Sequence, residues 1–304
     1  MKHLSLFESF EIVEPINYGE RLNNREINIL HGYNVFCPEL ILKDDNYYYV
    51  FDHRCENIKD VPDTYINAVC KKYGIKKYTI NDDHTVDVDD SVDLSYKFLK
   101  KIPFKFNIVS GNFNCFCNSL TTLEGCPNYV GGTFTCHSNS LTTLEGSPEK
   151  VVLSFNCYGN KLTTLEGGPK EVGGSFYCNH NKLTTLEGGP TSVGKNFICS
   201  NNKLTTLEGA PKEVDGDFDC GGNKLTTLEG SPELVSGDFY CRDNKLTTLE
   251  GGPTSVGGNF DCSGNQLTTL DGCPNVGGNF DCSVNKLTLF RKIGGTFVHK
   301  NKKS

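Results

Sequence analysis

FYCNHNKLTTLEGGPTSVGKN, residues 176–196, is followed directly by FICSNNKLTTLEGAPKEVDGD, residues 197–217. The second stretch repeats the first at its aromatic, cysteine, asparagine, leucine, glycine, proline and valine positions. Similar 21-residue units extend in both directions, and they begin at Phe113, Phe134, Phe155, Phe176, Phe197, Phe218, Phe239, Phe260 and, one residue early, Phe280. A fixed period near 20 residues predicts a solenoid, in which each unit buries its apolar face only against its neighbours.

The local pattern predicts how each unit folds. In Phe-x-Cys the two apolar side chains lie two residues apart, so a strand would point both of them inward. The asparagine that follows can bond to the backbone of a tight bend, and the next two leucines would fill the core. Proline then recurs in register, from Pro127 to Pro274, which disfavours a helix on the return path. We therefore expect one short parallel β-strand per repeat, extended convex segments and little helix.

Cysteine is abundant, and most of it occupies one repeat position. Of 15 cysteines, those of the column are Cys115, Cys136, Cys157, Cys178, Cys199, Cys220, Cys241, Cys262 and Cys282. Stacked repeats would place them roughly 5 Å apart in the interior, where reduced cysteine behaves as a small hydrophobic residue. A soft-metal or redox ladder, and disulfides along the column, are the alternatives. No histidine or carboxylate joins the column at ligand spacing, which disfavours a metal site.

Two regions differ in organisation. Residues 1–75 are not repetitive and read as a small α+β module, with a hairpin around the turn at 43–46 and a short helix at 62–74. Residues 76–304 read as the solenoid, after a hairpin signal at 77–88. Val92 lies 21 residues before Phe113, so we expect degenerate capping repeats at 76–109 and 286–304.

The repeat resembles the leucine-rich repeat. Val-x-x-x-Phe-x-Cys-x-x-Asn-x-Leu is similar to Leu-x-x-Leu-x-Leu-x-x-Asn-x-Leu, although the valine stands four residues before the phenylalanine where the family has three. The short period and the proline resemble the bacterial short-repeat class of injected effector proteins. The motif Leu-Thr-Thr-Leu-Glu-Gly-x-Pro more closely resembles the repeats of uncharacterised proteins of tailed bacteriophages. The resemblance implies a leucine-rich-repeat solenoid, and it does not imply the ubiquitin-ligase activity of effectors that carry a separate catalytic domain.

Composition excludes several function classes. The chain has 304 residues, a net charge of -7 and a pI near 5.5, which argues against general binding to nucleic acid or anionic membranes. No stretch approaches the roughly 20 apolar residues that span a bilayer, and the N-terminus lacks a secretory signal pattern. We therefore expect a cytoplasmic protein, in the host cytoplasm if it is phage-encoded.

Catalytic and cofactor motifs are also missing from the sequence. It contains no P-loop, no Gly-x-Ser-x-Gly and no His-Glu-x-x-His, so we expect no enzyme, no cofactor and no metal site. Cys37, His53, Cys55 and Cys70 could be imagined as a metal site or a Cys/His pair, but their spacing fits no ligand pattern. A buried-core role is the simpler interpretation.

Three exposed columns repeat with little change. They are a lysine row from Lys161 to Lys286, a glutamate row from Glu124 to Glu250, and a Thr-Thr column from Thr121 to Thr269. Solvated flanks are the simplest interpretation of the two charged rows. The threonine column resembles a regular ice-binding array, although threonine hydroxyls also serve bends.

Two outward columns vary between repeats, and we expect them to line the concave sheet. One lies between Phe and Cys and the other directly after Cys. Together with neighbouring positions they give an aromatic and apolar patch (Tyr158, Tyr177, His180, Ile198) beside an acidic patch (Asp217, Asp219, Asp238, Asp261), with Tyr240 and Arg242 among the acids. Tyrosine and arginine are frequent anchors of interfaces. These ten residues are therefore the predicted binding face, with drift in the absence of a ligand as the alternative.

The predicted function is a non-enzymatic, protein-binding solenoid that acts on a host or phage protein through this face. A structural virion or assembly protein, anchored by the N-terminal module, is the alternative. An enzyme with its site in residues 1–75 is a third possibility, disfavoured by the small size of that module.

Overall fold

The computed structural model describes residues 40–43, 46–51, 54–57 and 61–287. It divides into two compact units. One holds the residues up to Lys76 together with Ile80–His84, and the other holds Lys77–Thr79 and the chain from Thr85 onward.

The described part of the N-terminal unit is a three-stranded antiparallel sheet and one helix. Strand β1 (Leu40–Lys43) pairs with β2 (Asn46–Phe51), and β2 pairs with β3 (Arg54–Asn57). Helix α2 (Val61–Tyr73) ends at Gly74, where φ is 67° and the Ile75 N–H donates to the Cys70 carbonyl at 2.8 Å. The predicted hairpin and helix are confirmed, and β3 was not predicted. Cys37 and His53 lie outside the described residues.

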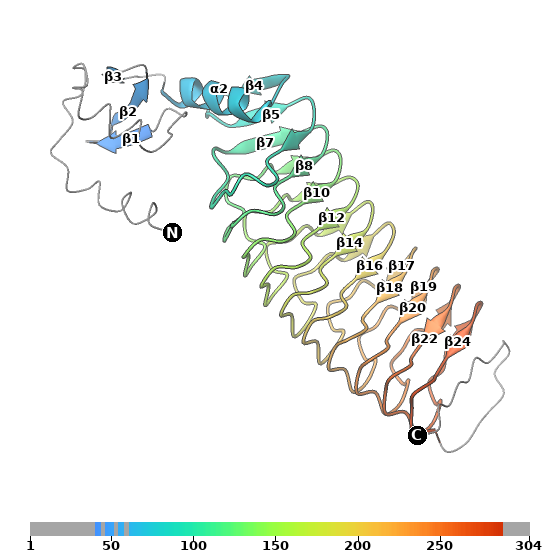
Figure 1. Ribbon diagram of the computed structural model, residues 1–304. Helices are drawn as coiled ribbons and strands as arrows, with labels where there is room; N and C mark the ends of the chain where they lie inside the picture. Colours follow the sequence, from blue (N-terminus) through green and yellow to red (C-terminus); the bar gives the residue numbers. More distant parts are fainter. Residues whose placement is uncertain (1–39, 44–45, 52–53, 58–60, 288–304) are drawn as a thin grey trace. The chain divides into compact units, whose positions relative to one another are not determined.

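In the second unit, the Phe-x strands stack into one parallel sheet (Figure 1). Phenylalanine pairs with phenylalanine in register, for example Phe176 with Phe197. The sheet has ten strands, which are β6 (Val92–Asp93), β8 (Phe113–Asn114), β10 (Phe134–Thr135), β12 (Phe155–Asn156), β14 (Phe176–Tyr177), β16 (Phe197–Ile198), β18 (Phe218–Asp219), β20 (Phe239–Tyr240), β22 (Phe260–Asp261) and β24 (Phe280–Asp281).

The expected parallel solenoid is confirmed. In its first strand, Val92 pairs with Phe113 and takes the place of a phenylalanine, in the register that the 21-residue period predicts. Of the second capping segment, 286–304, only Lys286 and Leu287 lie among the described residues.

Each repeat contains a second short strand that the sequence analysis did not predict. Its last residue is the repeat's valine, as in Glu171–Val172, and it pairs with the equivalent strand of the next turn. One sheet joins β4 (Tyr78–Ile80), β5 (Val86–Val88), β7 (Phe106–Val109), β9 (Tyr129–Val130), β11 (Lys150–Val151), β13 (Glu171–Val172) and β15 (Ser192–Val193), and its strands from β5 to β15 are parallel. A second joins β17 (Glu213–Val214), β19 (Leu234–Val235), β21 (Ser255–Val256) and β23 (Asn275–Val276). The expected extended return path is confirmed, and in addition its backbone pairs from turn to turn.

The second strand explains the displaced valine of the repeat. Val172 ends one strand, residues 173–175 turn a corner, and Phe176 begins the next strand. The residue that the leucine-rich-repeat pattern lacks therefore lies in this corner. The other tight turn falls at Glu-Gly. Gly188 has a φ of 82°, and a Cβ built there would lie 2.7 Å from the Glu166 backbone nitrogen, so the position suits glycine alone.

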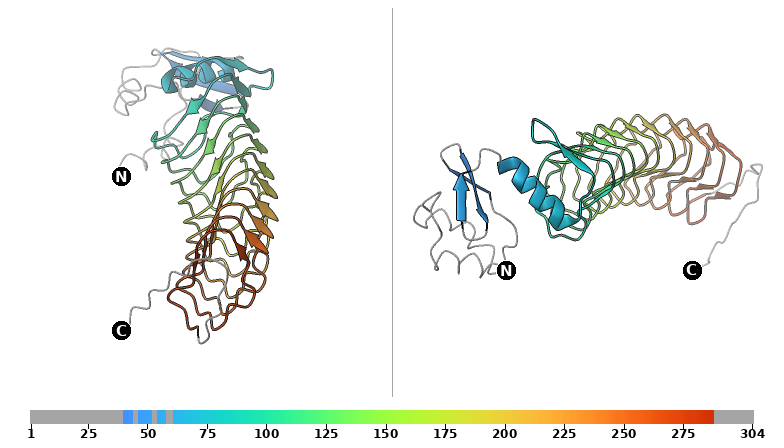
Figure 2. Two further views of the ribbon diagram at one scale, coloured as in Figure 1. Left: turned by 90° about the vertical axis from the view of Figure 1, so that its right-hand side faces the viewer. Right: turned by 90° about the horizontal axis from the view of Figure 1, so that it is seen from above.

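Columns of phenylalanine, cysteine, leucine and valine side chains fill the solenoid interior. The phenylalanine rings from Phe113 to Phe280 stack face to face, with centroids such as those of Phe176 and Phe197 at 5.4 Å. Phe197, Cys199, Leu204 and Leu207 are each fully buried, and their equivalents in neighbouring repeats are too. Offset stacking adds roughly 0.5–1.5 kcal/mol per aromatic pair to the area buried. A thin coil with a modest apolar content is stabilised in this way. Figure 2 shows its turns stacked along one axis.

An asparagine ladder satisfies the buried backbone between the turns. The Asn181 side-chain amide donates to the carbonyls of Cys157 and Cys178, at 3.1 and 3.0 Å. Its oxygen accepts from the Leu162 N–H at 3.0 Å. The same three bonds recur for Asn160, Asn202, Asn223, Asn244 and Asn265. In the described part of the chain, no buried side-chain nitrogen or oxygen lacks a partner.

The cysteines from Cys115 to Cys282 are free thiols, and the column lies in the core. Burial raises the pKa of its thiols well above their usual range at Cys136, Cys157, Cys178, Cys199, Cys220, Cys241 and Cys262. Burial and the neighbouring Cys282 also raise the pKa of the half-buried Cys273 to about 11.

We expect these column thiols to resist alkylation in the folded protein. Because the thiolate is the nucleophile, iodoacetamide at pH 8 should modify them at least about a hundredfold more slowly than the partly exposed Cys117. Peptide mass spectrometry over time measures the rates, and unfolding in urea should make all of these sites react alike. Equal rates in the folded protein would contradict the buried column.

No helix among the described residues is long and apolar enough to cross a lipid bilayer.

Candidate interaction surface

The outward side chains of the ten-stranded sheet form the most varied surface of the solenoid. Phe and Cys point into the core, so the residue between them points out and is half-buried, as Tyr177 and Ile198 are. The residue after Cys follows at the end of the strand, and the next residue turns the corner. His180 is such a corner residue, exposed and with a φ of 54°. We call these outward and corner positions, with the residue before each Phe, the ten-stranded face.

An aromatic stack runs along the first repeats of this face. The Phe116 ring lies parallel to the His137 ring at 4.6 Å, and His137 lies parallel to Tyr158 at 4.5 Å. Tyr96 adds an edge-on contact to Phe116 at 5.3 Å. Burial lowers the pKa of His137, which keeps its ring neutral at pH 7. The stack presents side chains that belong to four different turns of the coil.

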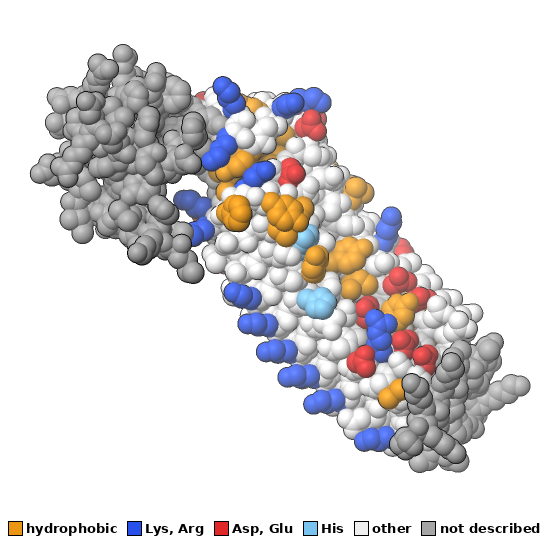
Figure 3. All heavy atoms as spheres, viewed as in Figure 1, with side chains coloured by type: hydrophobic (Ala, Val, Ile, Leu, Met, Phe, Trp, Pro, Cys, Tyr) orange, Lys and Arg blue, Asp and Glu red, His pale blue; other side chains and the backbone are white. Residues whose placement is uncertain are grey.

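Beyond the turn that holds Tyr96, the same repeats carry no charged side chain on this face. From Asn112 to Asn201, its positions hold Asn, Thr, Ser, Gly, Cys and the aromatic, histidine and isoleucine residues, without Asp, Glu, Lys or Arg. Figure 3 shows hydrophobic and histidine side chains gathered over these turns and acidic ones farther toward the C-terminal repeats. The face is thus divided into a neutral aromatic half (112–201) and an acidic half (217–281).

In the acidic half, the strand aspartates cap the corner that follows them. Asp219 Oδ1 accepts from the Gly221 N–H at 2.9 Å, and Asp261 Oδ1 accepts from the Ser263 N–H at 2.9 Å. Asp93 and Asn156 make the same contact two residues on. A local Asx turn therefore accounts for one oxygen of each strand aspartate.

Asp217 and Asp238 belong to a second ladder, at the position before Phe. Each backbone N–H there donates to the side chain one repeat earlier: Asp217 N–H to Asn196, Asp238 N–H to Asp217, and Asn259 N–H to Asp238, at 3.0, 2.9 and 2.6 Å. Serine and asparagine fill this role elsewhere, as at Ser154 and Ser175. These two aspartates are therefore partly structural, a role that the sequence analysis did not predict.

Tyr240 and Arg242 form a network with the aspartates. The Tyr240 hydroxyl donates to Asp238 Oδ2 at 2.6 Å, and the Arg242 guanidinium lies 5.1 Å from the Tyr240 ring centre. Arg242 also lies 3.7 Å from Asp261 Oδ2. The bond to Asp238, with burial and nearby negative charge, raises the pKa of Tyr240 to about 12. Burial alone would raise the pKa of Asp238, but the bonds from Tyr240 and Asn259 outweigh it and lower that pKa.

The structure brings the ten predicted residues onto one face. It places Tyr158, Tyr177, His180 and Ile198 in the neutral aromatic half, and Asp217, Asp219, Asp238, Tyr240, Arg242 and Asp261 in the acidic half. Their use in binding stays a prediction. The sequence analysis left out Tyr96, Phe116 and His137, although Phe116 and His137 stand in the same varying column as Tyr158. In three successive repeats the residue after the cysteine carries an aromatic or imidazole ring, and this pattern could have predicted the stack.

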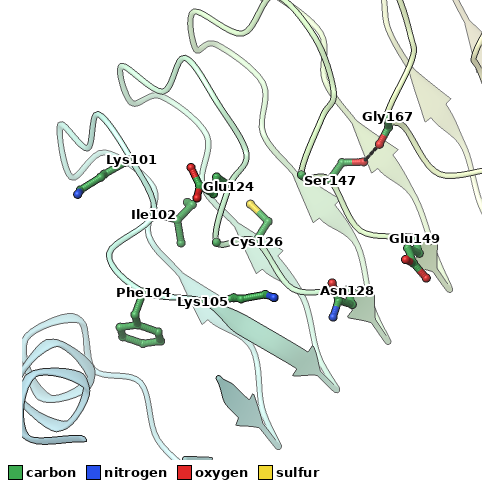
Figure 4. Close-up of a pocket in the computed structure, with 12 residues that line it drawn as sticks. Lys101, Ile102, Phe104, Lys105, Glu124, Cys126, Asn128, Ser147, Glu149 and Gly167 are labelled. Atoms are coloured by element: carbon green, nitrogen blue, oxygen red, sulfur yellow. Dashed lines mark hydrogen bonds between the residues drawn. The ribbon is translucent and has the colours of Figure 1, made fainter. Parts of the chain in front are cut away.

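A shallow groove of about 640 Å³ lies elsewhere, along the glycine turns of the first repeats. Lys101, Phe104, Lys105, Cys126 and Glu149 are among its lining residues (Figure 4). The two lysines and two glutamates that line it point along the rim and converge on no common centre (Figure 4). No group of three or more His, Cys, Asp or Glu side chains in the described part of the chain is arranged to hold a metal ion.

Comparisons with known proteins give one structural similarity. No family model matches the sequence, and no curated protein matches it. The fold is similar to YopM from Yersinia enterocolitica WA-314, with a TM-score of 0.41 and 18% sequence identity, over 64% of this chain and 60% of that chain. This chain thus matches less than two thirds of the YopM structure's length. The parallel coil, its core leucines and its asparagine ladder fit the leucine-rich-repeat plan that the sequence resembles.

Proposed function

We propose that this protein binds another protein through the ten-stranded face and catalyses no reaction. The observation that carries the proposal is the contrast between the interior and this face. Interior positions keep the same residues from turn to turn, whereas the outward positions differ in nearly every turn. A rigid scaffold that presents varied side chains is the usual design of a solenoid binding surface.

The chemistry of the neutral aromatic half favours a protein partner. Its half-buried Tyr, His and Phe rings are held by stacking, so little side-chain entropy is lost when a partner covers them. Ser, Asn and Gly surround them, which is the mixture found in antibody paratopes. The partner would place an apolar or aromatic surface on this half and basic groups on the acidic half.

The partner would be a host or phage protein met in the cytoplasm. The free thiols of the solenoid, from Cys115 to Cys282, suit a reducing compartment, and the phage assignment is supported by the sequence resemblance alone. The structural role in a virion remains the competing proposal.

Affinity capture with matched variants tests the binding face. One variant carries Tyr158→Ala, Tyr177→Ala and Ile198→Ala, and a second carries Asp219→Asn and Asp261→Asn, which keep the corner caps. The control carries Glu171→Ala and Glu213→Ala, two exposed residues of the second strands on another side of the coil. We expect the control to retain the partner and the first variant to lose at least about tenfold in affinity, since aromatic anchors dominate interfaces.

The second variant should lose affinity mainly at low salt, because exposed charges are screened. If all three proteins captured the partner equally, the partner would not bind through the ten-stranded face. Copurification with phage particles without a captured partner would favour the structural role.

A further inference from the structure

A second surface of the solenoid is uniform where the ten-stranded face is varied. The heptapeptide Lys-Leu-Thr-Thr-Leu-Glu-Gly occurs without change at 161–167, 182–188, 203–209, 224–230 and 245–251. In each copy the lysine, the first threonine and the glutamate are exposed, whereas both leucines are buried. We call this strip, five turns long, the Lys-Thr-Glu face. The blue row in Figure 3 is its lysine border.

Recent duplication does not explain this uniformity. The same five turns differ at the strand position of the ten-stranded face, which holds Asn156, Tyr177, Ile198, Asp219 and Tyr240. Drift has therefore acted on these repeats, and it has spared the exposed lysines, threonines and glutamates. A constraint other than shared ancestry therefore keeps the lysine, threonine and glutamate at these three surface positions in every turn.

The fold itself gives these three columns no role. The leucines fill the core, and the second threonine accepts the glutamate N–H, as Thr164 accepts from Glu166 at 3.1 Å. Across the described residues, no ion pair within 4.0 Å involves the five lysines or the five glutamates, and the first-threonine hydroxyls make no side-chain hydrogen bond. Lysines one strand spacing apart, about 4.8 Å, repel one another in the free molecule.

Both charged rows repeat at the pitch of the coil. The lysine N–H donates to the carbonyl of the first leucine one turn back, for example Lys182 to Leu162 at 2.9 Å and Lys203 to Leu183 at 2.8 Å. The turn at glutamate and glycine repeats with the same period. A ligand that makes the same contacts with every turn must have the same repeat spacing. A second copy of this coil has that spacing, because its repeats are the same.

We propose that the Lys-Thr-Glu face is the interface of a parallel homodimer, whose two-fold axis runs along the solenoid axis. Lysines border one side of the strip and glutamates the other. A two-fold axis along the coil turns the partner so that each lysine row faces the partner's glutamate row at the same level, with threonines facing each other between them. An axis across the coil would set lysine against lysine. Charge complementarity thus selects the parallel arrangement.

The dimer does not depend on the ten-stranded face, which it leaves free for a partner. The strip is narrow and largely polar, so the interface is at the small end of specific contacts, and we expect dissociation in the micromolar range.

Charge reversal in two complementary variants tests the proposal. One carries Lys182→Glu, Lys203→Glu and Lys224→Glu, and the other carries Glu187→Lys, Glu208→Lys and Glu229→Lys. Each variant alone should dimerise at least about a hundredfold more weakly than the natural chain in sedimentation velocity, because every reversed side chain meets a like charge. An equimolar mixture should restore a heterodimer. Circular dichroism confirms that each variant keeps its sheet.

Orientation is tested with Thr163→Cys at one end of the strip. In a parallel dimer the two introduced thiols meet, and oxidation links the two chains through a disulfide between them. A monomeric natural chain at hundreds of micromolar, a mixture that fails to associate, or dimerisation indifferent to both reversals would overturn the interface. A crosslink that does not form, while the charge variants behave as expected, would overturn its parallel orientation.

Discussion

Replacement of Asn202 by alanine should lower the free energy of unfolding by about 2–4 kcal/mol. The Asn202 amide donates to the carbonyls of Cys178 and Cys199, and its oxygen accepts from the Leu183 N–H. Alanine leaves the Leu183 N–H without a partner, whereas the Cys178 carbonyl keeps Asn181 as a donor and the Cys199 carbonyl keeps Asn223. The site is buried, since Asn202 itself is only 8% exposed. An unsatisfied buried polar group costs roughly 1–3 kcal/mol, and water entry would recover part of the loss.

Urea unfolding followed by circular dichroism measures this loss, and hydrogen exchange locates it. The Leu183 amide should exchange faster in the variant, because its acceptor is gone. Lys212→Ala is the control, since Lys212 is exposed and forms no ion pair among the described residues, and it should change stability by less than about 0.5 kcal/mol. A loss below about 1 kcal/mol for Asn202→Ala would mean that water replaces the ladder at little cost.

The repeat made the inward-facing part of the fold predictable. Phe and Cys alternate, asparagine follows at a fixed distance, and Val92 keeps the period where the phenylalanine is missing. Each of these features is a relation between neighbours in sequence, or a multiple of one period. Once the fold of one unit was predicted, stacking similar units gave the rest of the coil.

The second strand was hidden because it is too short to show a pattern. In Glu171–Val172 only one residue faces the core, with a proline before the strand and glycines after it. Two residues cannot display an alternation, so the segment read as an extended connection. Its pairing becomes visible only when the turns are superposed, with Val172 opposite Val151 and Val193.

The sequence predicted where the interaction surface lies, but it did not predict how the side chains on that surface contact one another and the backbone. The aromatic stack joins a phenylalanine, a histidine and a tyrosine, which look like drift when they are read along the chain. Asp219 and Asp238 read as free acids, whereas the structure uses one oxygen of each to hold backbone N–H groups. Such bonds depend on backbone positions two residues or one turn away, and no spacing rule reveals them.

Replacement of Phe197 by alanine should cost about 3–5 kcal/mol, through the loss of burial and the cavity left behind. The ring is fully buried and stacks on Phe176 at 5.4 Å and on Phe218 at 5.5 Å. Thermal and urea unfolding measure the loss. Phe197→Leu, which refills most of the volume, should lose distinctly less, and Phe98→Ala, where the ring is 90% exposed, should lose less than about 0.5 kcal/mol.

The position of Phe197 in the middle of the array adds a second expected result. Because each turn contacts only its neighbours, a weakened central interface separates the coil into two cooperative segments. Limited proteolysis of Phe197→Ala should therefore cut first near residue 197 and release a fragment from each side. The same alanine at Phe260, in the second strand from the described end of the sheet, should loosen only the last turns. If Phe197→Ala still unfolds in one transition and is cut at no preferred site, the solenoid is cooperative over a longer range than contacts between adjacent turns provide.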